Sequence, residues 1–180
     1  MPIGPYSPCP GGTGKKVKFC CPNLLGELQK IQRMLEGEQY QACLRHVEQL
    51  EKTNPDQACL LSIKTLLLRI HERFDDARRT AIRFLEKHPD NPIALAESAL
   101  LAAIDQEGHQ AMPLILRALR AATELHPRVY QAMDAIRQML AADGHFMAAR
   151  ALATLQVNVC REDRSPVEFL LQLNASPNVP

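Results

Sequence analysis

Aromatic side chains are scarce in this sequence, which contains no tryptophan and has only 4% aromatic residues in a length of 180. Single-stranded nucleic acids are commonly held by bases that stack on aromatic rings, so this composition argues against an extended aromatic binding platform. The apolar core must instead be aliphatic. Hydrophobic residues at 46% and charged residues at 23% are typical of a globular chain, and the length suits one domain rather than two large ones.

Long apolar runs are also missing from the sequence. The purest run extends from Ala99 to Ile104 and stops at Asp105, well short of the ~20 residues that a membrane-spanning helix needs. The N-terminus has no cationic start followed by an apolar stretch, which a secretion signal requires. The formal net charge is only +1, so the whole molecule has no field that attracts nucleic acid or anionic lipid. We therefore expect a soluble, cytoplasmic protein without a membrane span.

The beginning of the chain has an unusual composition. Residues 1–22 hold five of the 13 prolines, four of the eight glycines and three of the six cysteines. They also carry Lys15, Lys16 and Lys18 and no acidic residue. Proline and glycine at this density do not favour a helix or a strand, so the segment needs a source of order other than a hydrophobic core. A bound metal ion is the obvious candidate.

The six cysteines fall into two groups. A reducing cytoplasm disfavours disulfides, so cysteines there are usually metal ligands or small buried side chains. Cys43, Cys59 and Cys160 lie in apolar stretches of the chain, and we interpret them as small buried hydrophobic side chains. The other three lie in the proline- and glycine-rich segment and are the candidate metal ligands.

From Leu24 onward, apolar residues recur at the spacing of one helix face. The pattern predicts eight helices in antiparallel pairs, and a capping box at Ser165 predicts the start of a further helix. The expected turns and loops lie near Gly37, Arg73, Gly108, Gly144, Pro55, Pro89 and Pro127. We therefore divide the chain into a metal-binding segment (1–22), a helical repeat body (23–164) and a partial C-terminal helix and tail (165–180).

The helical body resembles the tetratricopeptide repeat. An aromatic residue opens the second helix of a unit, a small residue follows three positions later, and proline ends the unit. The stretch from Tyr40 to Pro55 has this pattern, and the stretch from Phe74 to Pro89 repeats it one period later along the chain. The unit that contains Pro113 departs from it. The resemblance implies an all-α, right-handed solenoid of about four hairpins that binds a protein or peptide on its concave face.

The N-terminal segment closely resembles the SEC-C motif, a small zinc module in which Cys-x-Cys is followed by a glycine- and lysine-rich stretch and then by Cys-Cys or Cys-His. Cys9, Cys20 and Cys21 match the first, third and fourth ligand positions, and Gly11 matches the second. The resemblance implies Zn²⁺ bound by these three cysteines, with water or a distant residue as the fourth ligand. The alternative is a decayed motif that binds no metal. We expect any metal to be bound by no cysteine of the helical body. A Gly11→Cys substitution is expected to tighten binding because it completes the tetrahedron.

SEC-C modules are known from the tail of the SecA preprotein translocase motor and as appendages on many bacterial proteins. The resemblance therefore implies a link to translation or translocation machinery. It also implies contact with a ribosome or a chaperone through Lys15, Lys16 and Lys18.

A catalytic role for the metal is disfavoured. Three ligands plus water is the layout of a catalytic zinc, but such a site needs a general base, and the segment 1–26 contains no Asp, Glu or His. We expect a non-enzymatic adaptor or scaffold whose body folds without residues 1–22. Two alternatives remain: an RNA- or ribosome-binding tag on a helical spacer, and an accessory part of a longer enzyme, suggested by the unpaired helix at 166–173.

Overall fold

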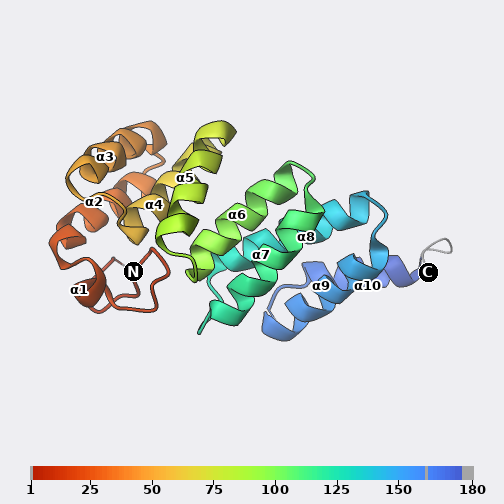
Figure 1. The fold of residues 1–180 in the computed structure, drawn as a ribbon. Coiled ribbons are helices and arrows are strands. Elements are labelled where there is room, and N and C mark those ends of the chain that lie inside the picture. The colour runs from red at the N-terminus through yellow and green to blue at the C-terminus, as the bar shows by residue number, and fades with distance from the viewer. Residues whose placement is uncertain (1, 161, 176–180) are drawn as a thin grey trace.

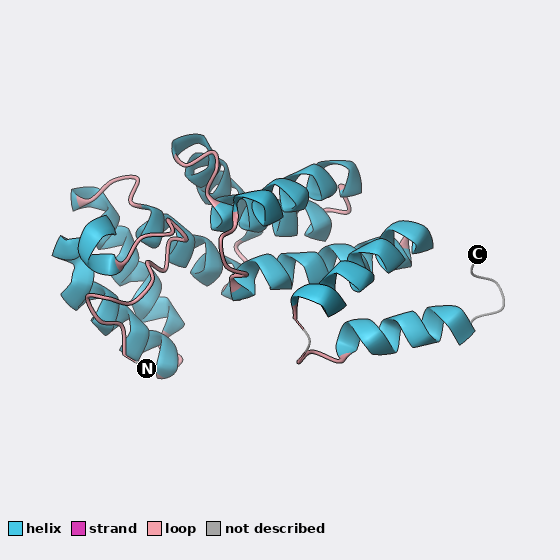
Figure 2. Ribbon diagram, turned by 90° about the horizontal axis from the view of Figure 1, so that it is seen from below, coloured by secondary structure: helices cyan, strands magenta, loops and turns pink. Residues whose placement is uncertain are grey.

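The structure is a computed structural model that describes residues 2–160 and 162–175. Within these residues the regular elements are helices, and no strand is present (Figure 2). The extended pairing that does occur is an isolated antiparallel bridge between Pro8 and Lys16. The all-helical fold class expected from the apolar periodicity is confirmed.

The helices follow one another along an elongated molecule, with the N-terminal segment towards one end and α10 at the other (Figure 1). Each helix packs mainly against those before and after it in the chain, and α6 also packs against α8. None of the described helices has the length and apolar character that crossing a bilayer requires. The elements are α1 (Val17–Cys20), the 3-10 helix η1 (Pro22–Leu24), α2 (Leu25–Glu36), α3 (Tyr40–Thr53), α4 (Ala58–Ile70), α5 (Phe74–Lys87), α6 (Pro92–Ile104), α7 (Gly108–Ala121), α8 (Pro127–Ala142), α9 (Phe146–Val159) and α10 (Ser165–Ala175).

The turns within helix pairs lie where the glycine and proline pattern predicts them. The left-handed residues in these turns are Glu38 (φ 55°), Glu72 (φ 56°), Gln106 (φ 60°) and Gly144 (φ 78°). They recur at nearly equal intervals along the chain, so the turns between paired helices are evenly spaced. In three of the four turns a non-glycine residue adopts the conformation for which glycine is the easier choice.

The core is mainly aliphatic, as the composition predicts, with Phe84 as its one fully buried aromatic side chain among the described residues. Its side chains come from both helices of each pair and form clusters that extend along the array. The largest fully buried side chains are Phe84, Leu28, Ile31, Leu44, Leu60, Leu61, Leu67, Leu68, Ile93, Leu95, Ile115 and Met133.

A buried ion-pair group joins alternate helices of the array. Glu97 on α6 is 1% exposed and accepts hydrogen bonds from Arg69 of α4 (3.0 Å) and Arg128 of α8 (2.8 Å). Arg128 also donates to the backbone oxygen of Ser62 on α4 (2.7 Å). Burial lowers the pKa of the Arg128 guanidinium, and Glu97 opposes that shift. The group fixes the relative positions of α4, α6 and α8.

The N-terminal segment, residues 1–22 of the division made from the sequence, packs against the helical body. Val17 is fully buried in the same cluster as Leu60 and Leu67 of α4. The backbone oxygen of Pro10 accepts a hydrogen bond from the Ser62 hydroxyl (3.0 Å). These contacts make the segment part of the core rather than an appendage.

The sequence suggested that the last helix has no partner. In the structure, α10 packs on α9, so this expectation is wrong. Leu173 is 6% exposed, and the ring of Phe169 lies under the guanidinium of Arg137. The backbone nitrogen of Ser165 donates to the carboxylate of Asp163, so the helix start is capped by Asp163 rather than by Ser165. The remainder of the predicted tail, 176–180, lies outside the described residues.

Candidate metal centre

The segment before α1 folds back on itself and brings Cys9 beside α1. The backbone nitrogen of Cys9 donates to the oxygen of Lys15 (2.9 Å), and that of Gly12 donates to the oxygen of Cys9 (3.0 Å). Gly12 has a φ of 67°, a conformation that a residue without a Cβ adopts readily. This turn sets Cys9 opposite Cys20 and Cys21 at the end of α1.

The three predicted ligands are brought together. The sulfur atoms of Cys9, Cys20 and Cys21 all lie within 4.8 Å of one another. The Sγ atoms of Cys9 and Cys21 are 3.9 Å apart, close to the ~3.8 Å edge of a tetrahedron with Zn–S bonds of ~2.3 Å. Cys9 and Cys21 are each 4% exposed. All three thiols are free of disulfides, so this cluster could hold a metal ion.

Polar hydrogens point at the cluster. The backbone nitrogen of Gly11 donates to Cys9 Sγ (3.4 Å), and the hydroxyl of Thr13 donates to Cys20 Sγ (3.3 Å). Hydrogen bonds from Cys21 and Cys59 hold the pKa of the Cys9 thiol well below its ordinary value. The neighbouring thiols of Cys59 and then of Cys9 raise the pKa of the Cys21 thiol. A divalent cation at the centre would displace the shared protons and stabilise the thiolates together.

Cys59 is a neighbour of the cluster that sequence reasoning missed. It lies in the first turn of α4, is fully buried, and belongs to the same core cluster as Cys9 and Cys21. The expectation of a small buried side chain holds for its exposure but overlooks these contacts. Cys59 lies far from Cys21 along the chain, so no ligand spacing connects them. The one clue was chemical: a tetrahedral zinc site takes four ligands, and the N-terminal segment supplies only three cysteines.

Gly11 cannot take the role of the missing ligand. A Cβ atom built on Gly11 would lie 2.4 Å from the backbone nitrogen of Cys59 and 2.5 Å from the carbonyl carbon of Ala58. Distances this short require the start of α4 to move. The expectation that Gly11→Cys tightens metal binding is therefore wrong, because the backbone of α4 occupies the space that the new side chain needs.

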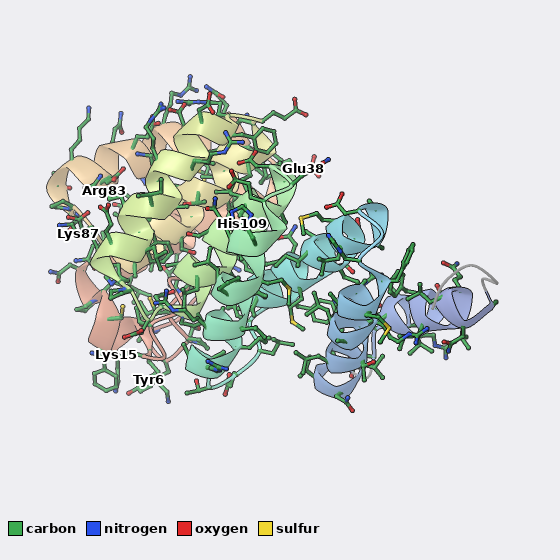
Figure 3. All side chains as sticks on the ribbon, turned by 45° about the vertical axis from the view of Figure 1, so that its right-hand side comes forward. Tyr6, Lys15, Glu38, Arg83, Lys87 and His109 are labelled. Atoms are coloured by element: carbon green, nitrogen blue, oxygen red, sulfur yellow. The ribbon has the colours of Figure 1, made fainter. Side chains whose placement is uncertain are left out.

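The lysines point away from the thiols. The Nζ atom of Lys18 lies 4.0 Å from the ring centroid of Tyr6 and 4.5 Å from that of Phe19. Lys16 also lies over Tyr6, at 5.5 Å. Lys15 is exposed, and Figure 3 shows Tyr6 and Lys15 together on the outside of the N-terminal segment. The three lysines thus lie on the outer surface. Hydrogen bonds from the Gly11 amide and the Thr13 hydroxyl, rather than the lysines, favour the thiolates.

No family model matches the chain, and the search of curated proteins finds no relative. The class that the fold and the site define is therefore a helical protein with an N-terminal cysteine cluster able to hold a metal ion.

Proposed function

We propose that this is a non-enzymatic interaction protein. Its body acts as a tetratricopeptide-like solenoid that binds a protein or peptide partner, and its N-terminal segment acts as a SEC-C-like zinc module. The regular spacing of the left-handed turns supports the solenoid. The three thiols support zinc, since thiolates are the ligands that structural zinc sites prefer.

Several carboxylates of the body are paired with lysine or arginine, which supports a structural rather than a catalytic role for them. Glu51 pairs with Lys64 and Arg83, each at 2.6 Å. Asp76 pairs with Arg73 and Arg79 on the same exposed face. Carboxylates held by cations in this way are poor general bases, because the neighbouring cations favour the charged form and oppose uptake of a proton.

The observation that carries the proposal is a surface on the N-terminal segment formed by Tyr6, Phe19, Lys16 and Lys18, which we call the Tyr6–Phe19 surface. Tyr6 is 65% exposed and Phe19 is 67% exposed, and the two lysines lie over the rings. Exposed aromatic rings are enriched at protein interfaces, where their apolar faces become buried. Their cationic surroundings favour an acidic partner.

The resemblance to SEC-C gives the class of partner. Modules of that kind are associated with translation and translocation machinery, so we place the partner there, with Lys15, Lys16 and Lys18 contributing charge. The body then supplies a second binding surface for a protein or peptide, and the chain acts as an adaptor.

A second candidate function is RNA binding by the same surface. Two exposed rings among lysines also suit stacked bases and adjacent phosphates. This reading makes the helical body a spacer, and it predicts an affinity that falls steeply with salt.

Affinity capture from a lysate of the source organism tests both readings. The captured proteins are compared for the wild type, Tyr6→Ala/Phe19→Ala, and the control Ile82→Ala, which removes a 57% exposed apolar side chain from α5. We expect a set of proteins that resists nuclease treatment, is retained by the control, and is lost with the double variant. Capture that nuclease abolishes supports the RNA reading, and identical capture by all three proteins contradicts both.

A further inference from the structure

The three-cysteine cluster is closed on one side by the start of helix α4. The Gly11 backbone lies against Ala58 and Cys59 so closely that no side chain fits between them. The loop is held there by two hydrogen bonds from the body: Ser62 donates to the oxygen of Pro10 (3.0 Å), and Asn91 donates to the oxygen of Gly11 (2.7 Å). The wall of the site is therefore a fixed part of the helical body.

Cys59 is the side chain that this wall presents to the cluster. It is fully buried and shares a core cluster with Cys9 and Cys21. A Cβ atom built on Gly11 would lie 2.4 Å from the Cys59 backbone nitrogen, and the Gly11 nitrogen itself donates to Cys9 Sγ (3.4 Å), so Cys59 lies directly beside the cluster. By contrast, the buried Cys43 donates weakly to the oxygen of Ile31 in the adjacent helix α2, at 4.0 Å.

The position of Cys59 also suits a thiolate. Cys59 is the second residue of α4, and the unpaired amides at the start of a helix favour negative charge. A structural zinc site is normally closed by four protein ligands, and the three thiols of the N-terminal segment leave one position open.

We propose that Cys59 is the fourth ligand of a four-cysteine zinc site, which joins the N-terminal segment to helix α4. The proposal rests on the proposed binding of zinc by Cys9, Cys20 and Cys21. On binding, each thiol that coordinates the ion releases its proton to solvent. The ligand that a SEC-C module carries at its own second position is thus replaced by one from the helical body, where Gly11 leaves room for it.

The most direct test uses the wild-type chain loaded with one equivalent of zinc. X-ray absorption spectroscopy at the zinc edge is expected to show four sulfur ligands at ~2.3 Å. Three sulfurs with one oxygen or nitrogen at ~2.0 Å would overturn the proposal. This measurement needs no substitution, so a folding defect in a variant cannot obscure the result.

Two matched variants extend the test. Cys59→Ser and Cys43→Ser each replace a fully buried cysteine of the body. Zinc affinity, measured by competition with a chromophoric chelator, should fall at least about tenfold in Cys59→Ser and remain at the wild-type value in Cys43→Ser. In the cobalt-loaded protein, the intensity of the thiolate-to-cobalt charge-transfer band should fall by about a quarter in Cys59→Ser. It should be unchanged in Cys43→Ser.

The failure of this proposal is distinguishable from the failure of zinc binding. If the wild type binds no zinc, both ideas are wrong. If Cys20→Ser weakens zinc binding while Cys59→Ser and Cys43→Ser match the wild type, the three-cysteine site stands and the fourth ligand is not Cys59.

Discussion

At residue 11 the absence of a side chain determines how the N-terminal segment meets the body. The close contact leaves no space for a Cβ, because the backbone of Ala58 and Cys59 lies against Gly11. By contrast, a Cβ atom built on Gly26, in α2, would meet no other atom within 4 Å. The two glycines therefore have opposite steric requirements, and a Cβ is tolerated only at Gly26.

A Gly11→Ala substitution is expected to lower the free energy of unfolding by about 1–3 kcal/mol, because the new Cβ pushes the loop away from α4. It should also weaken zinc binding. Gly26→Ala is the matched control and should raise the free energy of unfolding by up to about 1 kcal/mol. Urea unfolding of zinc-loaded proteins measures both. Equal stability of Gly11→Ala and the wild type would show that the loop does not contact α4 as described.

Glu97 is the second residue whose removal should have a large effect. Glu97→Ala leaves Arg69 and Arg128 partly buried without their shared acceptor, and we expect a loss of about 3–5 kcal/mol. Asp75→Ala is the control, because the Asp75 side chain is 87% exposed beside Arg78, and it should leave the unfolding midpoint unchanged. A loss for Glu97→Ala no larger than that of the control would contradict this account of the buried ion-pair group.

At the scale of elements, the sequence predicts helix pairs well because two independent signals coincide. Apolar spacing indicates the buried faces, and proline or glycine marks the interruptions. The sequence does not reveal that Glu38, Glu72 and Gln106 adopt left-handed conformations, since packing of the paired helices imposes that geometry on residues that do not prefer it. The capping of α10 by Asp163 was missed for a related reason, because Ser165 alone satisfies the sequence pattern.

The candidate site shows the same limit. Cys9, Cys20 and Cys21 are close in sequence, so their spacing predicts a cluster. Cys59 reaches that cluster through the packing of α4 against the N-terminal segment, which no local pattern encodes. A ligand contributed by tertiary structure is recognised only after the fold is known.

The helices should differ in their resistance to opening. Helices α4 and α6 have neighbours on several sides, whereas α10 packs on α9 at the end of the array. Arrays of this kind lose order from their ends. Hydrogen exchange followed by mass spectrometry should show the strongest protection in α4 and α6 and the weakest in α10. Protection of α10 equal to that of α6 would show that a further contact covers it.

At the scale of the whole molecule, the N-terminal segment and the helical body share one core. Val17 and Cys21 belong to the same cluster as Leu60 and Leu67, so the metal site and the array are coupled rather than separate. The expectation that the body folds without residues 1–22 stays a prediction, and this shared core argues against it. The shared core also gives the proposed adaptor a fixed geometry, since the Tyr6–Phe19 surface is held on the first helices of the array.

The coupling is tested most directly by thermal unfolding of the zinc-loaded chain with and without a chelator, followed by the helical circular dichroism signal. We expect one cooperative transition that moves to lower temperature when zinc is removed, because metal binding stabilises only the folded state. The Cys20→Ser/Cys21→Ser variant, which lacks two ligands, should show little or no shift on chelation. A wild-type melting curve that is unchanged by the chelator, although zinc has been removed, would contradict the central claim that the metal site is part of the core.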